Sequence, residues 1–214
     1  MNHLAATTNI TKQPKISQRQ SDNIEVLGDI YHANVNMAVW QRTLPAPVKQ
    51  AVKQGLEEGL RLNITQEVAV ADAFATLSHH YPLNQWSEAL VADIAMVVDM
   101  FGCLFDTPKV GLRLRTLTSA MCPRFHFDRV PCRLITTYNG GGTQWLPNDQ
   151  VMVENGRLEH QSTPGKAHVR RIDEGHIALL KGSQWPDNEL TPLVHRSPIV
   201  SSAQPRILLT LDAM

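Results

Sequence analysis

The sequence predicts an α+β fold in which N-terminal helices pack outside a jelly-roll-like β-barrel. Before residue 108, large apolar residues recur at the three- and four-residue spacing of amphipathic helices. From Val110 onward they alternate with polar residues in short segments that turn residues separate. Roughly eight short strands over about a hundred residues are typical of a jelly roll or barrel.

Length and composition predict one compact unit. The 214 residues are 43% apolar, which is enough for one good core. We expect residues 25–214 to fold together, with a helical part at 25–107 and the β core at 108–214. Residues 1–24 are rich in polar residues and have few large apolar groups, so we expect a mobile N-terminal tail there.

Charge and cysteine content narrow the class of protein. Lys and Arg number 20, as do Asp and Glu, so no basic field favours nucleic acid, and none is expected as a partner. Three cysteines without a C-x-x-C spacing indicate reduced thiols. The sequence shows no signal-peptide pattern, and its most apolar stretch, residues 89–105, is interrupted by Asp93 and Asp99. We therefore expect a soluble, cytoplasmic protein with no membrane partner.

Three helices are predicted in the N-terminal part. The first begins at Pro47, and its apolar stripe repeats every four residues, at Val48, Val52, Leu56 and Leu60. Thr65 is placed to cap the second, which ends near residues 79–82 because Pro82 disfavours helix in the residue before it. The third runs from about residue 85 to residue 105, and apolar residues cover most of its circumference, so it should be largely buried.

Strands are predicted through the rest of the chain. Residues 110–115 alternate between apolar and small or basic residues, as in a half-buried strand. Further strands are expected at 124–128, 133–138, 143–146, 150–154, 157–160, 168–172, 176–181, 192–196 and 206–212. Asn155-Gly156 predicts a tight hairpin between two of them, since both residues tolerate positive φ.

One expected strand carries a histidine and an aspartate two residues apart, His126 and Asp128. Alternate side chains of a strand share a face, so both would point the same way. His195 lies on a late strand, and Arg206 follows eleven residues later. Two imidazoles and one carboxylate form the facial triad that suits Fe(II) and leaves coordination positions open. Arg206 would then hold the distal carboxylate of an organic acid, as a 2-oxoglutarate site requires.

These residues resemble the Fe(II)/2-oxoglutarate-dependent dioxygenases of the double-stranded β-helix fold, nearest to the prolyl-hydroxylase-like branch. The resemblance covers about residues 108–214 and rests on His126-x-Asp128, RLITTY, GGGTQWLP, EGHIALLKG, and His195 with Arg206. The whole chain, including NVNMAVWQRTLP near Trp40, also resembles a bacterial family of unknown function. Members of that family are often encoded near zinc-homeostasis GTPases, which makes such a GTPase a candidate partner.

The resemblance to the dioxygenases implies a reaction, two cofactors and their ligands. His126, Asp128 and His195 would bind Fe(II) and form the catalytic site, and Arg206 would bind 2-oxoglutarate. Tyr138 would add a hydroxyl group to the same carboxylate. The enzyme would convert 2-oxoglutarate to succinate while it hydroxylates or demethylates an unknown small-molecule or protein substrate.

Other interpretations of the same residues remain open. A lone strand histidine is more often a hydrogen-bonded structural residue than a ligand. His160, His168 and His176 recur every eight residues and, with Cys122 or Cys132, would suit zinc if the strands brought them together. A non-catalytic metal-binding module of the same fold, linked to zinc or metal homeostasis, would use the same triad. Such a module has no need of Arg206, which therefore distinguishes it from an oxygenase.

Overall fold

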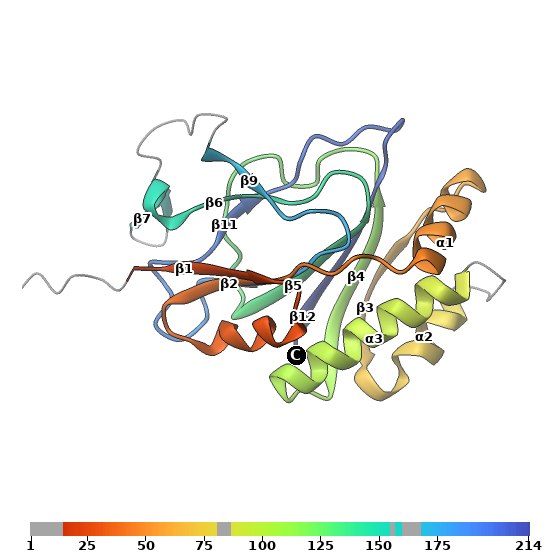
Figure 1. Ribbon diagram of the computed structural model, residues 1–214, viewed down its shortest axis with the longest axis horizontal. Helices are drawn as coiled ribbons and strands as arrows, with labels where there is room; N and C mark the ends of the chain where they lie inside the picture. Colours follow the sequence, from red (N-terminus) through yellow and green to blue (C-terminus); the bar gives the residue numbers. More distant parts are fainter. Residues whose placement is uncertain (1–14, 81–86, 155–156, 160–167) are drawn as a thin grey trace, which may run out of the picture.

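The computed structural model describes residues 15–80, 87–154, 157–159 and 168–214. Its largest element is a seven-stranded sheet in the order β1-β2-β10-β5-β12-β4-β3 (Figure 1). Neighbouring strands of this sheet are antiparallel, except that β1 and β2 are parallel. A three-stranded sheet, β11-β6-β9, and a two-stranded ribbon, β7-β8, are also present. The architecture is thus mixed α/β with a large, mainly antiparallel sheet.

The elements have the following bounds. The helices are η1 Ile24–Tyr31, α1 Ala46–Glu57, η2 Val70–Asp72, α2 Ala73–His80, α3 Ser87–Phe105 and η3 Asn148–Gln150. The strands are β1 Ser17–Ser21, β2 Val35–Trp40, β3 Asn63–Ala69, β4 Lys109–Leu117, β5 Cys132–Asn139, β6 Gln144–Leu146, β7 Met152–Glu154, β8 Arg157–Glu159, β9 Arg170–Arg171, β10 Ile177–Lys181, β11 Val194–Arg196 and β12 Arg206–Ala213.

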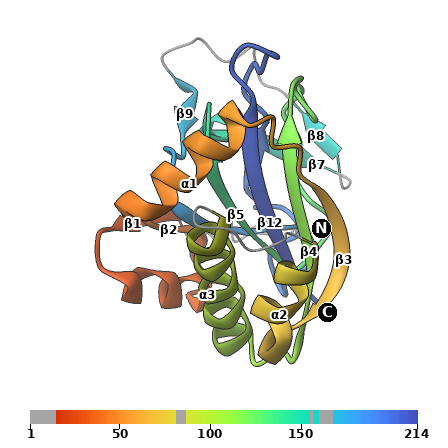
Figure 2. The same cartoon turned by 90° about the vertical axis from the view of Figure 1, so that its right-hand side faces the viewer.

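Helices cover one face of the large sheet (Figure 2). The main core there joins apolar residues of α1 and α3 to sheet residues such as Leu134 on β5 and Leu209 on β12. Ile94, Val97 and Phe101 of α3 are almost fully excluded from solvent, as the sequence predicted for this helix. Packing against the sheet therefore accounts for the nearly continuous apolar surface of α3.

The small sheet lies over the opposite face of the large one. Ile135 and Leu208 belong to a second core with Trp145 of β6 and Leu193. Their neighbours in sequence, Leu134 and Leu209, belong to the main core. Because successive side chains of a strand point to opposite faces, this second core lies on the side away from the helices. The interior between the two sheets is where the predicted site residues of β11 and β12 lie.

Most of the predicted elements are confirmed. α1 and α3 occupy the predicted segments, and Pro47 stands at the start of α1. The strands expected at 110–115 and after residue 132 lie within two residues of the predicted positions. β7 and β8 pair as a hairpin, although its predicted turn, residues 155–156, lies outside the described residues. The expected strand at 124–128 is wrong, since only His126 makes an isolated bridge there.

Two predictions for the N-terminal part are also wrong. Thr65 lies within β3 and does not cap a helix, because Ile64 and Val68, four residues apart, satisfy the strand period as well as the helical one. The tail predicted at 1–24 is wrong for Ser17–Ser21, which form β1 on the edge of the large sheet. An edge strand is held by backbone hydrogen bonds to its neighbour, so its polar side chains gave no signal.

None of the helices in the described part of the chain has both the length and the apolar character that crossing a membrane requires.

Candidate metal centre

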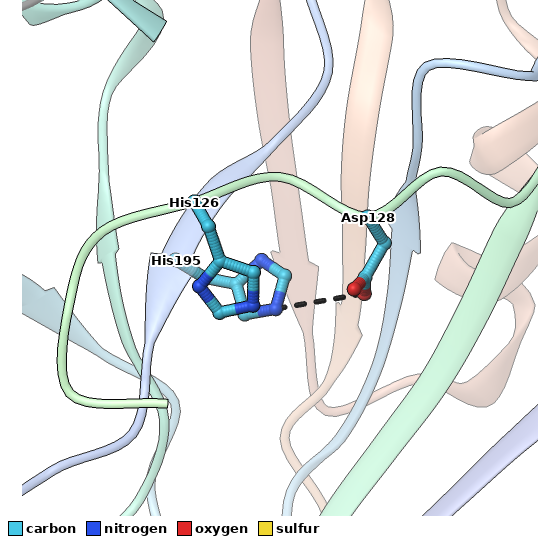
Figure 3. A group of neighbouring side chains, drawn as sticks. All are labelled: His126, Asp128 and His195. Atoms are coloured by element: carbon cyan, nitrogen blue, oxygen red, sulfur yellow. Dashed lines mark ion pairs between the residues drawn. The ribbon is translucent and has the colours of Figure 1, made fainter. Parts of the chain in front are cut away.

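A short backbone bridge brings the two predicted histidines together. The amide of His126 donates to the carbonyl of His195 at 3.0 Å, and the amide of His195 donates back to His126 at 2.8 Å. Residues that exchange both hydrogen bonds in this way are directly opposite each other, and their side chains share a face. Their ring centroids are 4.6 Å apart (Figure 3). Segments almost seventy residues apart in sequence thus present adjacent imidazoles.

Asp128 is positioned by a contact between backbones. Its carbonyl accepts a hydrogen bond of 2.9 Å from the amide of Ser183, just after β10. A Cβ atom added to Gly182 would lie 2.6 Å from the same carbonyl and 2.1 Å from that of Val130. Only glycine therefore allows the segment that carries Asp128 to come so close to the end of β10.

The three side chains converge on one point. One ligand atom from each of His126, Asp128 and His195 lies within 4.8 Å of the other two, and His195 Nε2 is 3.6 Å from Asp128 Oδ2. Two ligands about 2.0 to 2.2 Å from a shared ion lie at most about 4.4 Å apart, which the 3.6 Å separation of His195 Nε2 and Asp128 Oδ2 meets. Asp128 Oδ2 is buried and has no hydrogen-bond partner among the residues that the structure describes, although its carboxylate is a strong acceptor. An ion between these atoms would satisfy it.

The surroundings of the two imidazoles favour metal binding through Nε2. His126 Nδ1 lies 3.0 Å from the carbonyl of Arg124, and His195 Nδ1 lies 3.3 Å from that of Leu193. A proton on each Nδ1 makes these hydrogen bonds and leaves Nε2 with a lone pair. Burial lowers the pKa of His195 to about 4, against the attraction of Asp128, so its imidazole is neutral at pH 7. The donor set, two imidazole nitrogens and one carboxylate oxygen, fits Fe(II).

Arg206 is a buried cation without a carboxylate partner among the residues described. Only 1% of its surface is exposed, and its Nη2 donates to Thr137 Oγ1 at 2.8 Å and to Thr143 Oγ1 at 2.7 Å. Burial lowers the pKa of its guanidinium to about 10, which still leaves it charged at pH 7. Thr143 lies two residues before Trp145, which pairs with His195 across the small sheet, so a hydrogen bond joins Arg206 to the segment that leads into the strand beside His195.

Tyr138 lies on the wrong face for its predicted role. Its hydroxyl donates to Asp93 Oδ2 at 2.7 Å, and Arg42 holds the same carboxylate. Its ring belongs to the core on the helix side of β5, whereas the preceding residue, Thr137, bonds Arg206 on the other side. The prediction that Tyr138 binds the co-substrate carboxylate is therefore wrong, because its side chain points to the helix side of β5.

The alternative zinc site, built from His160, His168, His176 and a cysteine, has no support among the described residues. Within the described ranges, the group that could hold a metal is His126, Asp128 and His195. His160 lies outside those ranges. Cys132 is buried in the helix-side core, where burial raises the pKa of its thiol and disfavours the thiolate that zinc needs.

The sequence alone did not point to several residues that shape the site. Arg133, at the start of β5, contacts Asp128, and Thr137 orients Arg206. Both follow the alternation of β5, in which Arg133, Ile135 and Thr137 face the interior between the sheets. An arginine within an otherwise apolar and β-branched segment indicates a special role for Arg133. Only the sheet register shows that it forms ion pairs with Asp128 and Asp212.

Several solved structures resemble this chain at low identity. The dioxygenase for auxin oxidation of rice is 13% identical, with a TM-score of 0.49 over 88% of this chain and 76% of that chain. The corresponding dioxygenase 1 of Arabidopsis thaliana, in a complex with 2-oxoglutarate, is 11% identical, with a TM-score of 0.49 over 93% of this chain and 92% of that chain. A Pseudomonas putida prolyl-4-hydroxylase is 11% identical, with a TM-score of 0.45 over 88% and 96%. At this level of similarity, the chemistry has to be inferred from the side chains of this chain.

Comparisons of sequence place the chain in one family. No curated protein matches the chain. A family model described as "Protein of unknown function (DUF1826)" matches residues 21–212, which include all the residues of the candidate metal centre.

Proposed function

The chain belongs to the DUF1826 family, and we propose that it is an Fe(II)- and 2-oxoglutarate-dependent oxygenase with a double-stranded β-helix core. It would hydroxylate or demethylate a small-molecule or protein substrate while it converts 2-oxoglutarate and oxygen to succinate and carbon dioxide. His126, Asp128 and His195 would hold the iron, and Arg206 would hold the co-substrate.

The observation that carries this proposal is the buried charge of Arg206, which no carboxylate in the described ranges neutralises. Burying a guanidinium without an anion costs several kcal/mol, roughly, and two threonine hydroxyls do not neutralise it. A carboxylate delivered by a ligand would. The planar guanidinium suits a two-point contact with that carboxylate, and Thr143, which binds the guanidinium, leads into β6, the strand that pairs with β11 and His195.

Each part of the chain has a definite task in this reaction. When bound, Fe(II) supplies the redox chemistry that activates oxygen. The imidazoles of His126 and His195 and the carboxylate of Asp128 would hold the iron and leave its other coordination positions open. Thr137 and Thr143 fix the plane of the Arg206 guanidinium, so the far end of the co-substrate is held in one orientation.

Two substitutions separate the roles of the metal ligands and Arg206. Arg206→Ala should leave Fe(II) binding nearly unchanged, because guanidinium is not a ligand, but remove a desolvated ion pair with 2-oxoglutarate. The loss is roughly 2 to 5 kcal/mol, or about 30-fold to several thousand-fold in Kd. His195→Ala should lose the metal and, with it, the co-substrate. Both affinities are measured by anaerobic titration.

A control and an enzymatic measurement complete the test. Arg171→Ala removes an exposed arginine of the small sheet that pairs with Asp173, and it should leave both affinities unchanged. Wild type in air should release succinate. If wild type binds metal but not 2-oxoglutarate, or if Arg206→Ala binds 2-oxoglutarate as tightly as wild type, the proposed oxygenase function is refuted. The metal-binding module, with a zinc-homeostasis GTPase as its proposed partner, then takes its place.

A further inference from the structure

The carboxylate of Asp128 is held by an arginine that is itself fixed by a second carboxylate. Arg133 Nη1 lies 2.8 Å from Asp128 Oδ1. The other side of the same guanidinium holds Asp212 on β12, through Nε to Oδ1 at 2.7 Å and Nη2 to Oδ2 at 2.9 Å. Arg113 of β4 also donates to Asp212 Oδ2, at 2.6 Å. The charges therefore alternate from Arg113 through Asp212 and Arg133 to Asp128.

This chain of ion pairs treats the two oxygens of Asp128 differently. Oδ1 contacts Arg133, whereas Oδ2 faces His195 and accepts no hydrogen bond from the described part of the chain. A carboxylate with both oxygens free can bind a metal through either one or both of them. Here the two-point contact with Asp212 fixes the plane of the guanidinium, so Arg133 cannot turn aside and release Oδ1.

We propose that Arg133 is a positioning residue that restricts Asp128 to one metal-bound oxygen and thereby keeps one coordination position of the metal open. A facial triad with a one-oxygen carboxylate leaves three positions, two for a chelating 2-oxo acid and one for oxygen. If Asp128 bound through both oxygens, only two would remain. The inference rests on the metal centre of the proposed function but not on its reaction, because it concerns the number of ligands that the protein itself supplies.

The number of water molecules on the metal tests this directly. Water-proton relaxivity per bound Mn(II) reports it, and the electron paramagnetic resonance signal of free Mn(II) gives the amount bound. Wild type should show about three metal-bound waters. Arg133→Met keeps the aliphatic bulk but loses the guanidinium, so Asp128 should bind through both oxygens and the relaxivity should fall by about one third. Metal affinity should fall about 10- to 100-fold, as is typical when the partner of a ligand is lost, and 2-oxoglutarate should bind more weakly because a coordination position is occupied.

Arg113→Met is the matched control. It removes an arginine that contacts the same Asp212 but not Asp128, so the relaxivity should equal that of wild type. Arg133→Met leaves Asp212 with less compensation, and if it does not fold, Arg133→Met/Asp212→Leu removes both buried charges and gives the same measurement.

The outcomes separate this proposal from the proposed function. Unchanged relaxivity in the folded Arg133 variant, or only two waters on wild type, overturns the role of Arg133 and leaves the metal centre intact. Wild type that binds no Mn(II), or that keeps Mn(II) after His195→Ala, overturns the metal centre and the role of Arg133 together. Three waters on wild type, falling to two only when Arg133 is replaced, supports both.

Discussion

Two adjacent residues of β5 show how much depends on the face to which a side chain points. Thr137 faces the interior between the sheets and bonds Arg206, whereas Tyr138 faces the helices and bonds Asp93. In the segment RLITTY, apolar or hydroxyl-bearing residues occupy nearly every position, because β5 is buried on both faces. The sequence therefore identified the strand, but its pattern held no information on which face carries the site.

Substitution of these two residues should separate binding from stability. Tyr138→Phe should leave the Kd for 2-oxoglutarate unchanged and lower the free energy of unfolding by roughly 1.5 to 3 kcal/mol, because the buried Asp93 carboxylate loses a donor. Thr137→Val should weaken 2-oxoglutarate binding instead, since Arg206 then keeps only Thr143. Titration of co-substrate and urea unfolding measure the two effects. Weaker co-substrate binding in Tyr138→Phe alone would contradict the assignment of faces.

At the scale of whole elements, the sequence predicted best those that bury a continuous apolar surface. α3, β5 and β10 were found because each is a nearly continuous run of apolar or β-branched residues. The edge strands β1 and β3 were not, because an edge strand is specified by its neighbour's backbone more than by its own side chains. The segment around His126 owes its position to one backbone bridge with β11, which no local pattern records.

The burial of α3 can be tested within the helix itself. Ile94 is 1% exposed and Met96, two residues on, is 39% exposed. Ile94→Asp places an unpaired charge in the main core, which costs more than the few kcal/mol that a domain can lose, so little soluble protein should be obtained. Met96→Asp introduces the same charge two residues further along the helix, at an exposed position. It should yield normal amounts of protein with a melting temperature close to that of wild type. Similar yields of both variants would show that this face of α3 is not the buried one.

At the scale of the molecule, the candidate site depends on both sheets at once. His195 comes from the small sheet, Arg206 and Arg133 come from the large one, and Asp128 lies on the segment between β4 and β5. The sequence predicted Asp128, His195 and Arg206 as site residues from motif spacing and a family resemblance, but it did not point to Arg133. The alternating ion pairs that join β4, β12 and β5 were not predictable, because they depend on the register of three strands that are far apart in sequence.

Those ion pairs make the stability of the large sheet depend on pH in a defined direction. Burial raises the pKa of Asp212, but the hydrogen bonds and charges of Arg133 and Arg113 outweigh it and hold the pKa below its ordinary value. A carboxyl group whose pKa is lower in the folded state contributes stability above its unfolded pKa, about 3.9 for Asp, and loses it as the pH falls through the folded value. The contribution should thus be complete at neutral pH and disappear in acid.

Asp212→Asn should lack this contribution at every pH. Urea unfolding of metal-free protein should show the variant roughly 2 kcal/mol less stable than wild type above about pH 5, with the difference closing as the pH falls below about 4. Groups that titrate in both proteins largely cancel in the difference. Asp173→Asn, which removes an exposed partner of Arg171, should differ little from wild type throughout. A difference for Asp212→Asn that persists undiminished well below pH 3 would mean that charge on Asp212 does not hold β12 to its neighbours.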